Sequence, residues 1–159
     1  MKKTYVVFVI LFSLVLIVGC SAQNNKNTPE VTQTKQNNQL TPLSEQITID
    51  TSEYTDNVAY KPIITELKKN LAAWVELDRE NFSEGFITAE SAEQHYFLLA
   101  PPFNNLHFQG KITIVEFDDN PDRVDVNVQY KEQSNNEERS YTYNFGKNEQ
   151  GEWKITQID

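Results

Sequence analysis

The residue types that most often perform acid–base or nucleophilic chemistry are scarce in this chain of 159 residues. It contains one cysteine and two histidines, at Cys20, His95 and His107. A general base must come within hydrogen-bond distance of its substrate, yet the histidines fall in a predicted helix and in the loop before the first predicted strand. The chain also lacks Gly-x-Ser-x-Gly, Walker A and dinucleotide-binding motifs. An enzyme is therefore the less favoured alternative.

The acidic segment "DDNPDRVD" carries oxygen ligands at the spacing of a calcium loop. Asp118, Asn120 and Asp122 would occupy its first, third and fifth positions. However, Arg123 stands where such a loop needs glycine, and Gln129 where it needs a bidentate glutamate. A single cysteine likewise excludes a zinc site built from several thiolates. We therefore expect a solvated proline turn here, and neither a metal nor another cofactor.

The charge of the chain narrows the range of partners. It has 14 Lys and Arg against 23 Asp and Glu, which gives a formal net charge of -9. Such an acidic surface repels the phosphate groups of nucleic acids, whose binding proteins attract them with basic patches. Nucleic acid is therefore not an expected partner.

The lone cysteine lies at the end of an apolar segment. Lys2 and Lys3 precede the apolar residues 5–18, a stretch shorter than the roughly 20 residues that a membrane-spanning helix needs. The sequence "IVGC" that follows resembles the lipobox of bacterial lipoproteins, which implies cleavage before Cys20 and lipidation of its thiol. We accordingly expect a lipoprotein signal peptide over residues 1–19. An uncleaved anchor, or ordinary cleavage near "CSA", is the alternative.

The lipobox resemblance also implies a location. It would attach the chain through lipidated Cys20 to the extracytoplasmic face of a cell membrane, and the Asn-, Gln-, Lys- and Ile-rich composition favours a Gram-positive bacterium. Residues 21–52 contain no aromatic residue and few apolar ones. Such a segment buries too little surface to offset the entropy of ordering. We therefore predict a disordered tether over residues 20–55, within which "QITID" could form a strand against the domain.

Two helices are expected at the start of the folded part. Pro62 suits the first turn of a helix, where its missing N–H costs nothing. Apolar residues then recur every three or four positions, which predicts an amphipathic helix ending near Asn81: Ile64, Leu67, Leu71, Trp74 and Leu77. A second helix is predicted over residues 89–99, because Pro101 and Pro102 follow it directly.

Beyond the two prolines the pattern alternates with a period of two. Strands are predicted over 110–119, 123–132, 139–145 and 152–158, separated by short polar turns. Val124, Val126, Val128 and Tyr130 share one apolar face. Short turns join antiparallel neighbours, and the two helices must cover the apolar face. The expected fold is α+β, with two N-terminal helices packed on a curved antiparallel meander of four or more strands.

The order helix, helix and meander carries a resemblance. The helix "ITELKKNLAAWVELDRENF" and the closing "GEWKITQID" make residues 60–159 similar to the nuclear transport factor 2-like superfamily, whose SnoaL-like members share a cone-shaped α+β fold. We assign residues 56–159 to such a domain. The resemblance implies a pocket between the sheet and the helices, and the superfamily contains enzymes, binding modules and adaptors.

The expected pocket would be lined by large apolar and aromatic side chains. These candidates are Trp74, Phe82, Phe86, Tyr96, Phe117, Val126, Val128, Tyr130, Tyr143 and Trp153. They either enclose an apolar ligand or fill the core, and the size of the domain favours the second interpretation. The expected function is non-catalytic binding of a small apolar ligand or a protein partner at the cell envelope. A dehydratase or isomerase that uses the same pocket is the alternative.

Overall fold

The computed structural model describes residues 42–132 and 137–159. The predicted signal peptide, Cys20 and most of the predicted tether lie outside the described residues. In the described part, no helix has both the length and the apolar character needed to span a membrane.

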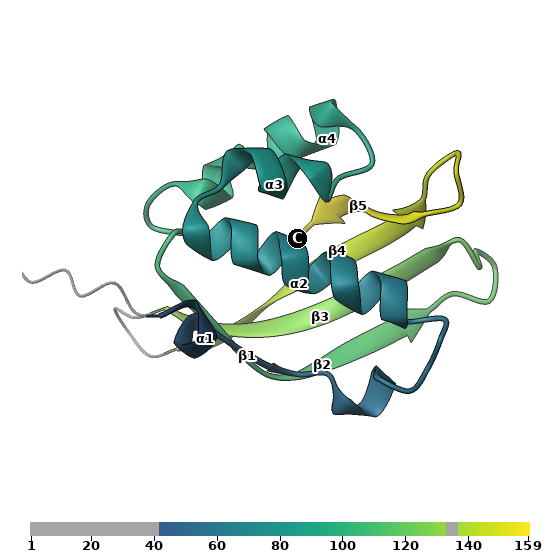
Figure 1. Ribbon diagram of the computed structural model, residues 1–159, viewed down its shortest axis with the longest axis horizontal. Helices are drawn as coiled ribbons and strands as arrows, with labels where there is room; N and C mark the ends of the chain where they lie inside the picture. Colours follow the sequence, from purple (N-terminus) through teal and green to yellow (C-terminus); the bar gives the residue numbers. More distant parts are fainter. Residues whose placement is uncertain (1–41, 133–136) are drawn as a thin grey trace, which may run out of the picture. The chain divides into compact units, whose positions relative to one another are not determined.

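The described part is an α+β domain built on one five-stranded sheet with the order β1-β2-β3-β4-β5 (Figure 1). Its strands are β1 (Ile47–Asp50), β2 (Leu106–Glu116), β3 (Arg123–Glu132), β4 (Glu138–Lys147) and β5 (Trp153–Ile158). Strands β2 to β5 pair antiparallel in chain order, which confirms the predicted meander. Strand β1 pairs parallel with β2, so the sheet is mixed rather than purely antiparallel.

Strand β1 corrects the predicted boundary of the tether. Residues 43–54 form α1 (Leu43–Gln46), β1 and the short 3-10 helix η1 (Ser52–Tyr54). Ile47 and Ile49 pack against the core, opposite Phe108 and Gly110 of β2. The Tyr54 hydroxyl accepts the N–H of Ile114 at 3.3 Å. The prediction of disorder up to residue 55 is therefore wrong for residues 43–54. Two isoleucines and a tyrosine of this segment contact the sheet and order it.

The first predicted helix is in fact two helices. Helix α2 (Lys61–Glu76) has Pro62 in its first turn as expected, but it ends where Leu77 adopts a left-handed conformation with φ 58°. Asp78 then starts α3 (Arg79–Glu84) by accepting the N–H of Asn81 at 3.1 Å. The prediction that the first helix ends near Asn81 is therefore wrong. The apolar spacing runs on through Leu77, but Asp78 starts a new helix because Asp is a strong N-cap residue.

The second predicted helix is also interrupted. It consists of α4 (Ala89–Gln94) and the 3-10 helix η2 (Tyr96–Leu99), with His95 between them. The Nδ1 atom of His95 lies 2.7 Å from the carbonyl oxygen of Ser91, and its Nε2 accepts the N–H of Ile158 at 3.0 Å. His95 is buried. The helix therefore breaks where this imidazole fastens the C-terminal end of β5.

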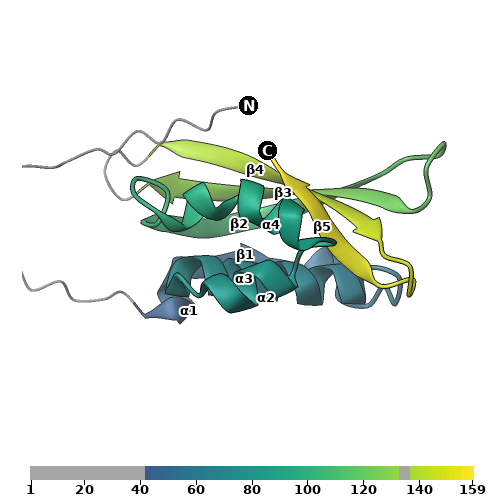
Figure 2. The same ribbon diagram turned by 90° about the horizontal axis from the view of Figure 1, so that it is seen from above.

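The core lies between α2 and one face of the sheet (Figures 1 and 2). Trp74 is its largest buried side chain, with its ring centroid 5.2 Å from that of Phe108 and 6.2 Å from that of Phe82. Its indole N–H donates to the carbonyl oxygen of Phe103 at 3.0 Å. Through these contacts Trp74 links α2 to both the sheet and α3. Its burial also stabilises the fold, because burial of apolar surface is the main favourable term in folding.

Tyr143 offers a test of this core, because its buried hydroxyl has no hydrogen-bond partner among the described residues. Burial raises the pKa of Tyr143 well above its ordinary value. A buried hydroxyl without a partner costs free energy, so Tyr143→Phe is expected to leave the free energy of unfolding unchanged or to raise it by up to about 1 kcal/mol. Urea denaturation measures this quantity.

A matched control removes a tyrosine hydroxyl that does have a partner. Tyr54→Phe deletes the acceptor of the Ile114 N–H and should lower the free energy of unfolding by about 1 kcal/mol. A clear loss of stability in Tyr143→Phe, equal to that in Tyr54→Phe, would mean that the Tyr143 hydroxyl is satisfied inside the protein.

Candidate binding site

The residues predicted to line an interior pocket divide into two groups. Seven of them are buried in the core: Trp74, Phe82, Phe86, Val126, Val128, Tyr130 and Tyr143. They pack against one another and against neighbouring apolar residues, and Phe82, Val126, Val128 and Tyr143 are completely inaccessible to solvent. This packing favours the core-filling interpretation of these positions over the ligand-binding one.

Tyr96 was predicted to line the pocket between the sheet and the helices, but its contacts are with α3. Its ring lies under the guanidinium group of Arg79, 3.8 Å from the ring centroid, and its hydroxyl is 2.6 Å from the Ser83 hydroxyl. These two contacts lower the pKa of Tyr96 from its ordinary value. Tyr96 therefore connects η2 to α3 and is not part of a site on the sheet.

Phe117 and Trp153, by contrast, line a pocket of about 480 Å³. We call it the sheet-end pocket. Its apolar wall comes from Tyr60, Ile63, Phe117, Val124 and Trp153, and its charged side chains are Glu116, Asp118, Arg123 and Lys147. The volume falls within the range of small-molecule sites.

The antiparallel meander explains why these residues meet. The connections β2–β3 and β4–β5 leave the sheet at the same end, because alternate hairpins of a meander share an end. Glu116 is the last residue of β2 and Arg123 the first of β3, while Lys147 ends β4 opposite Trp153, which begins β5. Tyr60 precedes α2 and closes the pocket on the helical side.

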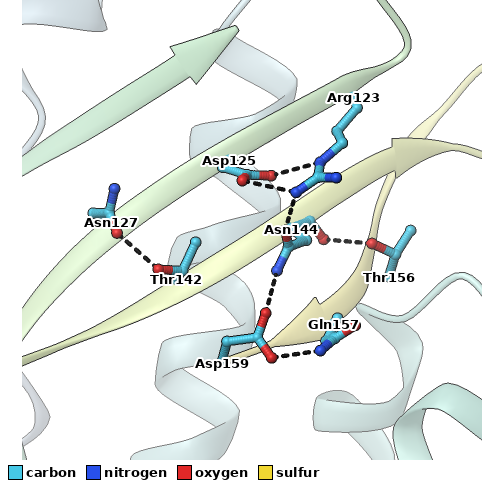
Figure 3. A network of polar contacts seen from close by, with 8 residues as sticks. All are labelled: Arg123, Asp125, Asn127, Thr142, Asn144, Thr156, Gln157 and Asp159. Atoms are coloured by element: carbon cyan, nitrogen blue, oxygen red, sulfur yellow. Dashed lines mark hydrogen bonds and ion pairs between the residues drawn. The ribbon is translucent and has the colours of Figure 1, made fainter. Parts of the chain in front are cut away.

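Arg123 is fixed by a polar network on the sheet face opposite the core (Figure 3). Its Nε and Nη2 atoms each donate to the carboxylate of Asp125 at 3.0 Å, and Nη2 also donates to Asn144 Oδ1 at 3.0 Å. The Asn144 amide donates in turn to Asp159 at 3.0 Å. Asp125 raises the pKa of Arg123, mainly through these hydrogen bonds. The guanidinium is thereby held over the Phe117 ring, 4.6 Å from its centroid.

The second cation of the pocket is arranged in the same manner. The Nζ atom of Lys147 lies 2.6 Å from Asp122 Oδ1 and 5.1 Å from the centroid of the Trp153 ring. Each cation of the pocket therefore has one carboxylate partner and one aromatic ring. Cations over aromatic faces are favourable because the ring quadrupole is negative there.

Tyr60 and Glu116 form the third polar pair. A hydrogen bond to the Glu116 carboxylate raises the pKa of Tyr60 above its ordinary value of 10.0, and the negative charge of Glu116 adds to this effect. Tyr60 therefore stays protonated well into the alkaline range and donates to Glu116. Tyr60 and Glu116 both line the sheet-end pocket.

Replacing Glu116 by Gln is expected to lower the pKa of Tyr60 towards 10.0. In the natural chain, ionisation of Tyr60 loses the donated hydrogen bond and places a second negative charge beside the carboxylate, so ionisation needs a higher pH. A ¹³C NMR titration of the Tyr60 ring measures this pKa. Glu45→Gln, on α1 at the far end of the sheet (Figure 1), is the control. A Tyr60 pKa that is equal in both variants would contradict the pairing.

A second hollow of about 770 Å³ adjoins the sheet-end pocket. The two share Ala59 and Trp153 as lining residues. Val58 is 84% exposed at the rim of this second hollow. The site is therefore larger than one small pocket, with Trp153 at its centre.

The remaining residues considered from the sequence are engaged elsewhere. His95 is buried against Ile158, and the Nε2 atom of His107 lies 3.2 Å from the Thr48 hydroxyl. In the predicted proline turn, Asp122 pairs with Lys147. Across residues 42–132 and 137–159, no three histidine, cysteine or acidic side chains form a cluster that could hold a metal ion.

No family model, curated protein or solved structure matches the chain.

Proposed function

We propose that the chain is a lipid-anchored binding protein of the bacterial cell envelope, and that its α+β domain takes up a small ligand in the sheet-end pocket. The observation that carries this proposal is the contrast between two groups of aromatic residues. Seven of the ten residues predicted to line an interior pocket pack into the core, whereas Phe117 and Trp153 line a pocket of about 480 Å³. A ligand would therefore bind at the end of the sheet and not between the sheet and the helices.

The anchor belongs to the proposal on sequence grounds alone. Two lysines, an apolar segment and "IVGC" precede the polar residues after Cys20. Lipidation of Cys20 would place the domain outside the cytoplasmic membrane. The proposed tether would join Cys20 to the domain near residue 42. The Gram-positive cell type is part of the same proposal.

We also propose the nuclear transport factor 2-like cone as the fold family. The order of helices followed by a four-stranded antiparallel meander supports it. The parallel strand β1 is an addition to the arrangement that the resemblance implies. Because this superfamily contains both enzymes and binding modules, the family alone does not decide the activity.

Binding without catalysis is proposed because both cations of the pocket are paired with carboxylates and no histidine lies among its lining residues. Arg123 is held by Asp125, Lys147 by Asp122, and Tyr60 by Glu116. A general base must come within hydrogen-bond distance of its substrate, and neither His95 nor His107 lines the pocket. A dehydratase or isomerase that uses the pocket remains the alternative.

Mass spectrometry of the purified full chain tests the proposal. A small molecule should copurify in a stoichiometric amount with the natural chain and be lost from Trp153→Ala, which removes an aromatic side chain that lines both hollows. Leu77→Ala is the control, because Leu77 is an exposed apolar residue outside both hollows. Equal amounts on the natural chain and on Trp153→Ala, or no stoichiometric molecule on the natural chain, would contradict the proposal.

A further inference from the structure

We propose that the sheet-end pocket selects organic cations, namely ligands that carry an ammonium group. This inference rests on the proposed function, because it names the class of ligand for the same pocket. It follows from three properties of the lining. These are its aromatic rings, the pairing of its two cations with carboxylates, and the further carboxylates that form no ion pair.

The aromatic rings are the first property. Tyr60, Phe117 and Trp153 contribute three rings to one pocket. Two of them already carry a cation of the chain itself, with Arg123 4.6 Å from the Phe117 centroid and Lys147 5.1 Å from the Trp153 centroid. Both distances are within the roughly 6 Å at which a cation is attracted to a ring face. Aromatic faces attract positive groups, and among the described residues no lysine or arginine lies over the Tyr60 ring.

The second property is that the two cations of the lining are neutralised. Asp125 makes two hydrogen bonds of 3.0 Å to Arg123, and its side chain is only 14% exposed. Asp122 lies 2.6 Å from Lys147. An anionic ligand would have to compete with both carboxylates for these cations. Arg123 is the harder to recruit, because Asn144 and Phe117 also hold it in place.

The third property is the negative charge that remains. Glu116 and Asp118 line the pocket, and Asp119 belongs to the same turn. Among the described residues, none of these three carboxylates forms an ion pair with a lysine or arginine. Glu116 accepts a hydrogen bond from the neutral Tyr60, so its charge stays uncompensated. These charges attract a cation and repel an anion.

Charge and aromatic faces together therefore suit a cation with an apolar shell. A quaternary ammonium group meets both requirements, since its methyl groups contact the rings while its charge faces Glu116. Recognition of such groups by several aromatic side chains and a carboxylate needs a pocket that excludes water. The apolar Ile63 and Val124 of the sheet-end pocket provide that surface.

Three probes of the same shape separate charge from size. They are choline, the neutral 3,3-dimethylbutan-1-ol and the anionic 3,3-dimethylbutanoate, each titrated into the full lipidated chain in maltoside micelles. Binding is followed by tryptophan fluorescence, because Trp153 lies in the pocket and Trp74 is buried in the core. Choline is expected to bind at least tenfold more tightly than the alcohol, and the carboxylate more weakly than either.

Charge variants tie the selectivity to the pocket. Glu116→Gln is expected to weaken choline binding at least fivefold and to leave the affinity for the alcohol unchanged. Glu45→Gln removes the same charge on α1 and should change neither affinity. Because Glu116 lies on the surface, the variant is expected to fold, which circular dichroism verifies.

The possible outcomes distinguish this inference from the proposed function. Equal affinities for choline and the alcohol, both lost in Trp153→Ala, would overturn the cation selectivity while the pocket remained a binding site. Tighter binding of the carboxylate would overturn it in favour of an anion site at Arg123 and Lys147. Saturable binding of none of the three probes would overturn both the inference and the small-ligand function.

Discussion

Trp74→Ala is expected to lower the free energy of unfolding by about 3–5 kcal/mol, the usual cost of truncating a buried aromatic side chain in a core. Trp74 is 1% exposed and contacts the rings of Phe82, Phe108 and Tyr141 from α3, β2 and β4. Its removal would leave a cavity where three elements meet. A loss of this size is a large share of the 5–15 kcal/mol that stabilises an average domain. Urea denaturation of the full chain measures it.

Trp74→Phe is the matched control for this prediction. It keeps most of the buried apolar surface and loses the indole N–H that donates to the carbonyl oxygen of Phe103. The expected loss is about 1–2 kcal/mol. If Trp74→Ala costs no more than Trp74→Phe, the aromatic contacts of Trp74 do not stabilise the domain and the described core is incorrect.

Cys20→Ala is expected to abolish lipid attachment and to shift the chain from the membrane fraction to the soluble fraction or to an unprocessed precursor. The physical reason is the loss of the thiol, which in the lipobox interpretation is the only acceptor of lipid, since the chain contains one cysteine. The acidic chain has no comparable basic segment after Cys20 that would hold it at an anionic membrane. Labelling with radioactive palmitate and membrane fractionation measure both effects.

Ser21→Ala, one residue further along, serves as the control for the anchor. It should keep both the label and the membrane location, because it leaves the thiol intact. Palmitate incorporation into Cys20→Ala, together with retention in the membrane, would overturn the lipoprotein interpretation.

The strands were predictable where one face of the sheet is buried throughout. Residues 123–132 were predicted as a strand and form β3 over the same residues, because valines alternate with polar residues and the valines are all buried. Strand β1 was predicted only as an alternative to a disordered tether, from the short alternation in "QITID", and the structure confirms that alternative. Its stability comes from pairing with β2, which lies far away in the sequence.

The helix boundaries could not be predicted from the apolar spacing, because capping residues determine where these helices begin and end. The stripe of apolar residues continues through Leu77, although that residue is 46% exposed and ends α2 in a left-handed conformation. Asp78 was the available signal, since Asp is a preferred N-cap. His95 gave no such signal. It interrupts the second predicted helix because its ring reaches the backbone of Ile158, a contact between distant parts of the chain.

The candidate site was only partly predictable. Phe117 and Trp153 were selected as pocket residues, but they were assigned to the interior of the fold. In β2 the inward alternation passes from Ile112 to Ile114, and Phe117 lies beyond the end of the strand. Arg123 and Lys147 looked like ordinary solvated charges in the sequence. Their positions over aromatic rings follow from how two hairpins meet, which residue types alone do not specify.

We propose that a ligand binds at the end of the sheet and not inside the fold. NMR of the full lipidated chain, titrated with choline in maltoside micelles, distinguishes these two locations. We expect shifts of the Trp153 indole signal and of the amides of Phe117 and Lys147, with unchanged methyl signals of Val126 and Val128. Shifts of those two interior valines without shifts at Trp153 would overturn this proposal, because they would place the ligand between the sheet and the helices.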